Sequence, residues 1–212
     1  MMRAAVRMLL LVMSSDGFCI FVAALTVAPA LHAQSAQTRP ETGAERTARM
    51  DALREAARRH IAQDRTIYSP SEVDDIEARY RSAHRQDPPQ LPRSDAAPIL
   101  QDLVAAYPKS QRSGCAVLQL ARMVPSTERE RYLRRAITSH GDAWCESGVQ
   151  VGALARALLA VELAGAGKFD DAERLATEVA TMFPGAIDDS GAPLERLLEG
   201  IRLLKEDARP SR

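Results

Sequence analysis

Cys115 and Cys145, the two cysteines beyond the N-terminal segment, carry the side chains with the widest choice of chemistry. A thiolate is a nucleophile and a metal ligand, whereas an even pair of cysteines in an oxidising compartment usually forms a disulfide. The pair is not in CxxC spacing, which gives little support to thioredoxin-type redox catalysis. We therefore predict a structural disulfide, with thiol chemistry by the pair and free buried thiols as the alternatives.

Histidines and acidic residues supply the other groups that could do chemistry. His60, His84 and His140 belong to no HExxH or comparable ligand spacing, although the loop at 140–146 (HGDAWCE) gathers several ligand-type atoms. We interpret that loop as a solvated loop ahead of a helix, and the acidic turn at 188–191 as a helix cap rather than a calcium site. GxSxG, P-loop and GxGxxG motifs are absent from the sequence. We expect no catalytic constellation, no metal and no cofactor.

The N-terminus has the order of parts typical of a secretory signal peptide. Arg3 and Arg7 form a basic start, residues 17–28 form a short apolar core, and Ala33 is a small residue at a cleavage position. The apolar core is short for a membrane span. We therefore predict a signal peptide over residues 1–33; an uncleaved membrane anchor is the alternative.

Charge and export together restrict the location and the partners. Without residues 1–33 the chain keeps 26 basic and 27 acidic residues, so its net charge is near −1. This balance provides no electrostatic footprint for nucleic acid or for an anionic membrane. No second segment resembles a membrane span. We expect a bacterial protein that is periplasmic or secreted, with no nucleic-acid partner and no membrane span after signal cleavage.

The next part of the chain divides into a leader, a helical pair and a linker. Residues 34–48 are polar and lack an apolar period, which predicts a flexible leader. Residues 49–86 predict a helical pair, whose second helix starts at the capping-box sequence Ser69-Pro-Ser-Glu72. Residues 87–94 are Pro-rich and predict a stiff linker.

From residue 95 onward, helical periodicity continues to the end of the chain. No alternating strand of useful length is visible, so the fold class is all-α, with about eight helices. We expect a repeat region over 95–206 and a C-terminal tail over 207–212. The expected helices of this region are 95–107, 112–124, 127–139, 147–166, 168–182 and 191–206.

Residues 153–184 resemble a tetratricopeptide repeat, a helix–turn–helix unit that stacks into solenoids. Small residues stand where paired helices approach, an aromatic residue follows the glycine of the turn, and a proline closes the unit. Arg156 and Val179 depart from the family pattern. The residues that carry the resemblance are Leu159, Ala160, Leu163, Gly167, Phe169, Ala172 and Pro184.

A weaker version of the pattern lies upstream. Residues 99–108 look like the second helix of a preceding repeat, and residues 116–121 look like the next first helix. The segment at 107–110 (YPKS), which a helix of small residues follows, is similar to repeats in bacterial envelope proteins of the Tol–Pal and barrel-assembly type. The resemblance implies a short right-handed solenoid of antiparallel helix pairs; a generic helical bundle is the alternative.

The resemblance also implies which surface binds and how the cysteines meet. Cys115 would lie in the first turn of one first helix and Cys145 just before the next, so neighbouring helix ends would bring them together. Repeats of this family bind partners through exposed positions of their first helices, which here are Gln119, Arg122, Leu154, Ala157 and Val161.

The function that follows from these features is a non-catalytic module that binds a protein or peptide in the cell envelope. These mostly apolar positions would form a groove for the partner; in the alternative, the chain's own helix at 50–62 fills that groove. A second hypothesis is an envelope thiol-chemistry factor that uses Cys115 and Cys145, and a third is a secreted toxin-associated or structural protein. The lysine and asparagine clamp of chaperone-binding repeats is absent.

Overall fold

The computed structural model describes residues 41–84 and 95–208. The predicted signal peptide (1–33), the leader as far as residue 40, the linker at 87–94 and the last four residues of the tail lie outside the described residues. Within the described ranges no helix combines the length and the apolar character needed to cross a membrane.

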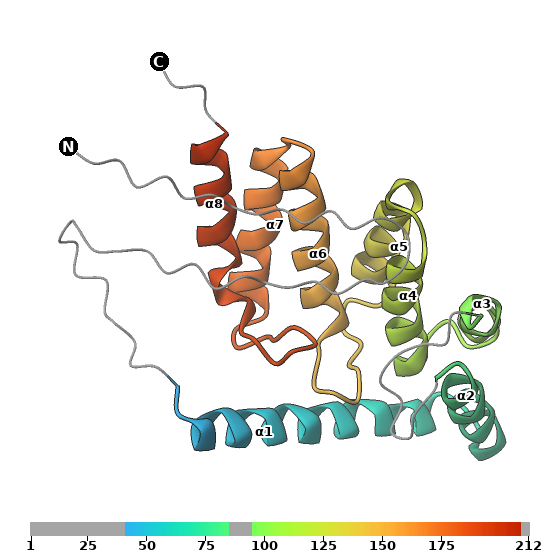
Figure 1. Ribbon diagram of the computed structural model, residues 1–212. Coiled ribbons are helices and arrows are strands. Elements are labelled where there is room, and N and C mark those ends of the chain that lie inside the picture. Colours follow the sequence, from blue (N-terminus) through green and yellow to red (C-terminus); the bar gives the residue numbers. More distant parts are fainter. Residues whose placement is uncertain (1–40, 85–94, 209–212) are drawn as a thin grey trace, which may run out of the picture. The chain divides into compact units, whose positions relative to one another are not determined.

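The described part of the chain is all-helical, as its periodicity predicts. Its regular elements are helices, and isolated bridges pair Trp144 with Gln150 and Ile187 with Pro193. Figure 1 labels the eight α-helices. They are α1 (Gly43–Ala62), α2 (Pro70–Ser82), α3 (Ala97–Ala106), α4 (Gln111–Met123), α5 (Ser126–Ser139), α6 (Val151–Gly165), α7 (Phe169–Met182) and α8 (Leu197–Asp207), with short 3-10 helices η1 (Gln63–Thr66) and η2 (Leu194–Arg196).

The first helix begins earlier than the sequence analysis predicted. Residues 34–48 were expected to form a flexible leader, but α1 starts at Gly43. The reason is local: Thr42 and Glu45 form a capping box, in which the Thr42 hydroxyl accepts from the Glu45 N–H and the Glu45 carboxylate accepts from the Thr42 N–H at 2.8 Å. The signature was present in the sequence. The hydrogen bonds of this capping box start the helix at residues where the sequence shows no apolar periodicity.

The capping box expected at the start of α2 is confirmed. The Ser69 N–H donates to the Glu72 carboxylate at 2.7 Å, and the Ser69 hydroxyl caps the Glu72 N–H. At the end of α6 the chain turns through Gly167, whose φ of 75° fits the left-handed region. There the Lys168 N–H donates to the Leu163 carbonyl and the Gly167 N–H to the Ala164 carbonyl, the paired bonds of a Schellman cap.

The core is built on α4 and α6. Ten of the fifteen residues of α6 and nine of the thirteen residues of α4 are buried. Each helix from α3 to α8 packs on the helix before it, and α4 also contacts α6, which in turn contacts α8. Because α6 has neighbours on several sides, it is apolar nearly all round, as expected of a core helix.

Candidate functional site

Two long turns, which precede α6 and α8, have the same backbone design. We call residues 143–151 the α5–α6 turn and residues 186–194 the α7–α8 turn. In the first, the Cys145 N–H donates to Val149, the Gly148 N–H to Cys145, and the Val151 N–H to Ala143. The second contains the same three bonds, each shifted by 43 positions: Asp188 to Ala192, Gly191 to Asp188, and Leu194 to Ala186. The isolated bridges, Trp144 with Gln150 and Ile187 with Pro193, have the same offset.

The sequence repeats weakly at the same offset of 43 positions. The glycines, Gly148 and Gly191, both have positive φ angles, 92° and 78°, which L side chains rarely adopt. The helices before the turns, α5 and α7, also keep this offset in their bounds. The identical residue pairs in and after the turns are Ala143 with Ala186, Ser147 with Ser190, Gly148 with Gly191, and Leu154 with Leu197.

The N-terminal helix lies across both turns. We call α1 together with η1 the strap. The Arg46 guanidinium donates to the Ser190 carbonyl at 2.9 Å, and Arg49 donates to the Gly191 carbonyl at 3.3 Å. At Gly148 the strap backbone comes so close that an added Cβ would lie 2.8 Å from the Cβ of Leu53. Glycine is therefore needed here for its φ angle and also for the lack of a side chain.

The end of the strap contacts the short link before α4. The Asp64 carboxylate accepts the Gln111 N–H, with 3.1 Å to each oxygen, and so caps the N-terminus of α4 from another element. The Lys109 N–H donates to the Tyr68 hydroxyl at 3.1 Å. The strap and the residues after it thus contact, in order, the segments before α8, α6 and α4. Figure 1 shows α1 running below these helices.

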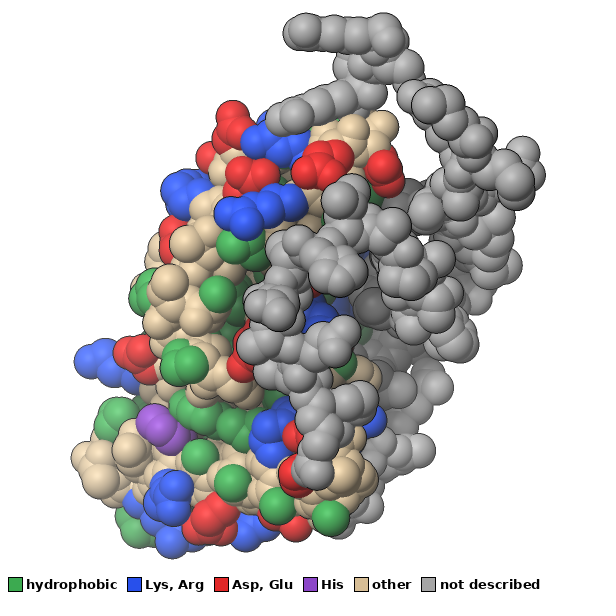
Figure 2. Space-filling view, turned by 90° about the vertical axis from the view of Figure 1, so that its left-hand side faces the viewer, with side chains coloured by type: hydrophobic (Ala, Val, Ile, Leu, Met, Phe, Trp, Pro, Cys, Tyr) green, Lys and Arg blue, Asp and Glu red, His purple; other side chains and the backbone are tan. Residues whose placement is uncertain are grey.

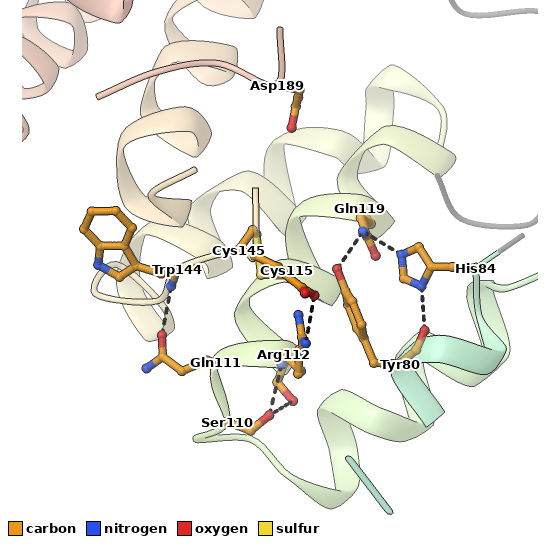
Figure 3. Close-up of a disulfide and its surroundings, with 12 residues drawn as sticks. Tyr80, His84, Ser110, Gln111, Arg112, Cys115, Gln119, Trp144, Cys145 and Asp189 are labelled. Atoms are coloured by element: carbon orange, nitrogen blue, oxygen red, sulfur yellow. Dashed lines mark hydrogen bonds and ion pairs between the residues drawn. A yellow bond between two sulfur atoms is a disulfide. The ribbon is translucent and has the colours of Figure 1, made fainter. Parts of the chain in front are cut away.

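The disulfide joins the α5–α6 turn to α4. Cys115 and Cys145 are bonded, with Cα atoms 5.6 Å apart, and Cys115 has no exposed surface. The predicted pairing is confirmed (Figure 3). Trp144, beside the bridge, donates its backbone N–H to the Gln111 side-chain oxygen at 2.8 Å, and its ring stacks on His60 of the strap, with 5.2 Å between the ring centroids.

A buried polar cluster lies between α2 and α4 beside the disulfide (Figure 3). The side chain of Arg112 is 7% exposed and makes a bidentate ion pair with Glu77, at 2.8 and 2.9 Å, and a further bond to Glu146 at 3.1 Å. Its guanidinium lies 4.7 Å from the centroid of the Tyr80 ring, close enough for a cation–π contact. Arg112 therefore joins α2, α4 and the α5–α6 turn.

Gln119 completes this cluster. Its amide nitrogen bonds the Tyr80 hydroxyl at 3.0 Å and the His84 Nε2 at 2.9 Å, while His84 Nδ1 bonds the Tyr80 carbonyl. Burial lowers the pKa of His84 and raises that of Tyr80. Both shifts favour the neutral forms of the two side chains.

Two further buried groups have strongly shifted pKa values. Burial raises the pKa of Asp64 to about 6, against the hydrogen bond from Gln111, which lowers it. Burial, assisted by the charge of Arg135, lowers the pKa of His140 to about 4. His140 lies in a small polar hollow between the α3–α4 link and the end of α5. Among the described residues, no three metal-ligand side chains converge.

The structure separates the five residues predicted to bind a partner. Gln119 is bonded inside the polar cluster, and Leu154 and Ala157 are only 3% and 4% exposed. Arg122 forms an ion pair with Asp189 of the α7–α8 turn. Val161, at 55%, has the largest exposure that the structure gives for an apolar side chain of this set. The exposed positions predicted from the family pattern are thus mostly covered, because α2 and the neighbouring first helices pack over them.

Sequence reasoning missed the residues that hold the strap and the cluster in place, namely Asp64, Glu77, Tyr80 and Arg112. Arg112 gave one signal, since it is the charged residue in the first half of a helix whose following residues are small or apolar. The turns gave another, because Ser147-Gly148 and Ser190-Gly191 repeat in similar contexts.

No protein-family model, curated protein or solved structure matches this chain. The resemblance to tetratricopeptide repeats therefore rests on the chain's own residues.

Proposed function

We propose that this chain is a non-catalytic helical-repeat module, exported to the bacterial envelope, that binds a protein or peptide partner. The observation that carries the proposal is Val161. It is 55% exposed on α6, a helix otherwise mostly buried. Val161 is an exposed branched apolar residue on the most buried helix of the described chain, and we assign it as the apolar anchor of the contact, since such anchors dominate binding energy.

The repeat architecture supports this proposal. Helices α3 to α8 pack in chain order, and the turns before α6 and α8 share one hydrogen-bond pattern. We infer a solenoid of helix pairs whose period, 43 residues between the two turns, is longer than the about 34 residues of a tetratricopeptide repeat. Solenoids present extended binding surfaces, because each unit contacts only its neighbours.

The binding surface that we propose is narrower than the family pattern predicts. It centres on Val161 and includes the partly buried Leu158, which lies three residues earlier on α6. Arg122 is left out of this surface because it pairs with Asp189 of the α7–α8 turn. A partner of this surface would supply an apolar side chain. The strap crosses the turns before α6 and α8, and we propose that it covers this end of the helices in place of a partner.

We prefer a structural disulfide to thiol chemistry for the cysteine pair. Exchange requires a thiolate to reach one sulfur along the bond axis, and this approach is restricted because Cys115 is fully buried and Cys145 is partly buried. We therefore assign the cysteine pair to stability and propose no reaction for it.

Site-specific photo-crosslinking tests the binding surface. A photoreactive amino acid replaces Val161 in bacterial cells that export the full chain, and Met182, which is 58% exposed on α7, is the matched control. We expect one discrete crosslinked species from position 161 and none of that mass from position 182. The same species should vanish when Leu158→Asp is added.

Identical crosslinks from both positions would contradict the proposed surface. The same cells test export independently. The periplasmic protein should start near Gln34 or Leu31, whereas an intact Met1 in the membrane fraction would contradict cleavage and favour the anchor.

A further inference from the structure

The outer face of α8 carries a regular stripe of exposed residues. We call Arg196, Gly200, Leu203 and Asp207 the α8 stripe. All four are exposed, and Leu203 is one of the large apolar residues on the surface, at 41%. Steps of four, three and four residues keep them on one face of a helix. Figure 2 looks onto the side of the molecule where α8 lies; apolar side chains stand singly there, and charged ones gather toward the upper end.

The offset between the two turns shows what this stripe corresponds to. Moved back by 43 positions, the α8 stripe falls on Ala153, Ala157, Ala160 and Ala164 of α6, all at most 5% exposed. On α6 that face is covered by neighbouring helices. On α8 the equivalent face has no neighbour among the described residues, because α8 is the last helix of the described chain.

Gly200 has no function in the single chain that the structure reveals. It lies in the interior of α8, where glycine is less favourable than alanine by roughly 1 kcal/mol. A Cβ added there would meet nothing within 4 Å. Neither its backbone nor its surroundings require glycine, so the notch that it leaves beside Leu203 is open to a side chain from outside.

We propose that the α8 stripe is the interface with a second copy of this chain, with the two α8 helices packed antiparallel. A two-fold axis between residues 201 and 202 places Gly200 opposite Leu203 of the second copy, so each leucine enters the other chain's notch. The same axis places Arg196 opposite Asp207 of the second copy, twice. A two-fold interface must be complementary to itself, and this stripe is complementary in both size and charge.

The neighbouring charges agree with this register. Arg196 and Asp207 have no ion pair within their own described chain, whereas Lys205, on the inner side of α8, pairs with Asp170 and Glu173 of α7. On the flank of the stripe, Glu199 would lie about two 1.5 Å steps along the axis from Arg202 of the second copy. A solvated face does not require opposite charges at positions that a two-fold axis brings together.

The contact is small, so the dimer should be weak. A single helix pair buries less than the roughly 1,200 Å² of the smallest standard interfaces, and association of that size is typically micromolar or weaker. The proposal does not depend on the partner proposed above, because Val161 lies outside the stripe.

Sedimentation velocity of the mature chain, from about 5 µM to about 1 mM, tests the interface. We expect the mass to rise from monomer toward dimer across this range. Leu203→Glu should weaken the association at least tenfold, while Met182→Glu, at an exposed apolar site on α7 outside the stripe, should leave it unchanged. Circular dichroism checks that both variants fold.

Charge reversal tests the register. Asp207→Arg should weaken the dimer, because it places an arginine opposite Arg196 of the second copy at both ends of the interface. Adding Arg196→Glu in the same chain should restore the dimer. Gly200→Ala should raise the melting temperature of the dilute monomer and weaken the dimer. A monomer at every concentration overturns the proposal. The antiparallel α8 interface is overturned if Leu203→Glu leaves the dimer as stable as before, or if the double charge reversal fails to restore it. It is also overturned if another protein binds the stripe and the chain does not associate with itself.

Discussion

Asp64 should make the stability of this protein depend on pH in an unusual direction. Its carboxylate is 3% exposed and caps the N-terminus of α4 through the Gln111 N–H. Burial raises its pKa from 3.8 to about 6; the bond from Gln111 and the charge of Arg112 lower it, and the charge of Glu77 raises it. Desolvation of the ionised carboxylate therefore outweighs the cap.

The sign follows from proton binding. Between pH 6 and 3.8 the folded state holds a proton on Asp64 that the unfolded state has released, so the free energy of unfolding rises as the pH falls. The difference between the two pKa values corresponds to at most about 3 kcal/mol. Above pH 6 the ionised group carries this cost in full, and the contribution is then constant.

His140 works in the opposite direction. Burial lowers its pKa from 6.5 to about 4, so the stability that it contributes is present above pH 6.5 and is lost as the pH falls toward 4. A titration of the wild-type protein alone would mix the two effects. The difference between the wild type and an Asp64 variant removes the His140 contribution, since both proteins contain it.

Urea unfolding of the wild type and of Asp64→Asn at several pH values from 4 to 8 measures that difference. Asparagine keeps an acceptor for Gln111 but cannot ionise. It also buries an amide group, which changes the stability by a constant amount and leaves the slope unaffected. We expect the wild type to gain up to about 3 kcal/mol relative to the variant between pH 6.5 and 4. Asp142→Asn, on an exposed loop, is the matched control.

Parallel stability curves for the wild type and Asp64→Asn would refute this reasoning. They would mean that water reaches the carboxylate in solution and that its burial is not maintained. A slope of the opposite sign would mean that the α4 N-terminus stabilises the ionised form more strongly than burial opposes it.

Two further predictions concern stability. The Cys115–Cys145 bridge closes a loop with a sequence separation of 30, for which the chain-entropy model gives about 3.6 kcal/mol, so reduction should lower the melting temperature by roughly 7–14 °C. Thiol labelling and mass measurement before reduction should find neither cysteine free, and two labels there would contradict the bridge. Gly152→Ala would place a Cβ 2.3 Å from the Gly141 carbonyl and should destabilise by about 1–3 kcal/mol or more, measured by urea unfolding. Gly165→Ala, which meets nothing within 4 Å, is its control, and equal losses would contradict the close approach.

The helices themselves could be predicted because their signals are local. Apolar periodicity located α2 to α7 to within a few residues, and Ser69 with Glu72 marked the start of α2. The predicted helix boundaries were wrong where hydrogen bonds, and not apolar periodicity, determine where a helix begins. Thr42 and Glu45 start α1 ahead of its apolar residues, and the turn at 186–194 delays α8, which was expected to begin at 191.

The candidate site was predicted less well, because exposure is a property of the assembled chain. Gln119 and Leu154 are polar and apolar members of first helices, and a single repeat would leave both exposed. In the whole molecule, α2 bonds Gln119 and the helices packed around α6 bury Leu154. Val161 keeps its predicted exposure because it lies beyond these contacts.

The sequence by itself determined the fold class, the order of the helices and the identity of the disulfide partners, since periodicity, capping and the number of cysteines are read along one chain. Only the tertiary structure decided where the strap lies, which carboxylate caps α4 and which face of α8 stays open. Asp64 and Gln111 are distant in sequence, and neither residue type specifies the other. Contacts of this kind depend on the packing of whole helices, because only packing fixes the distance and the desolvation that give each pair its energy.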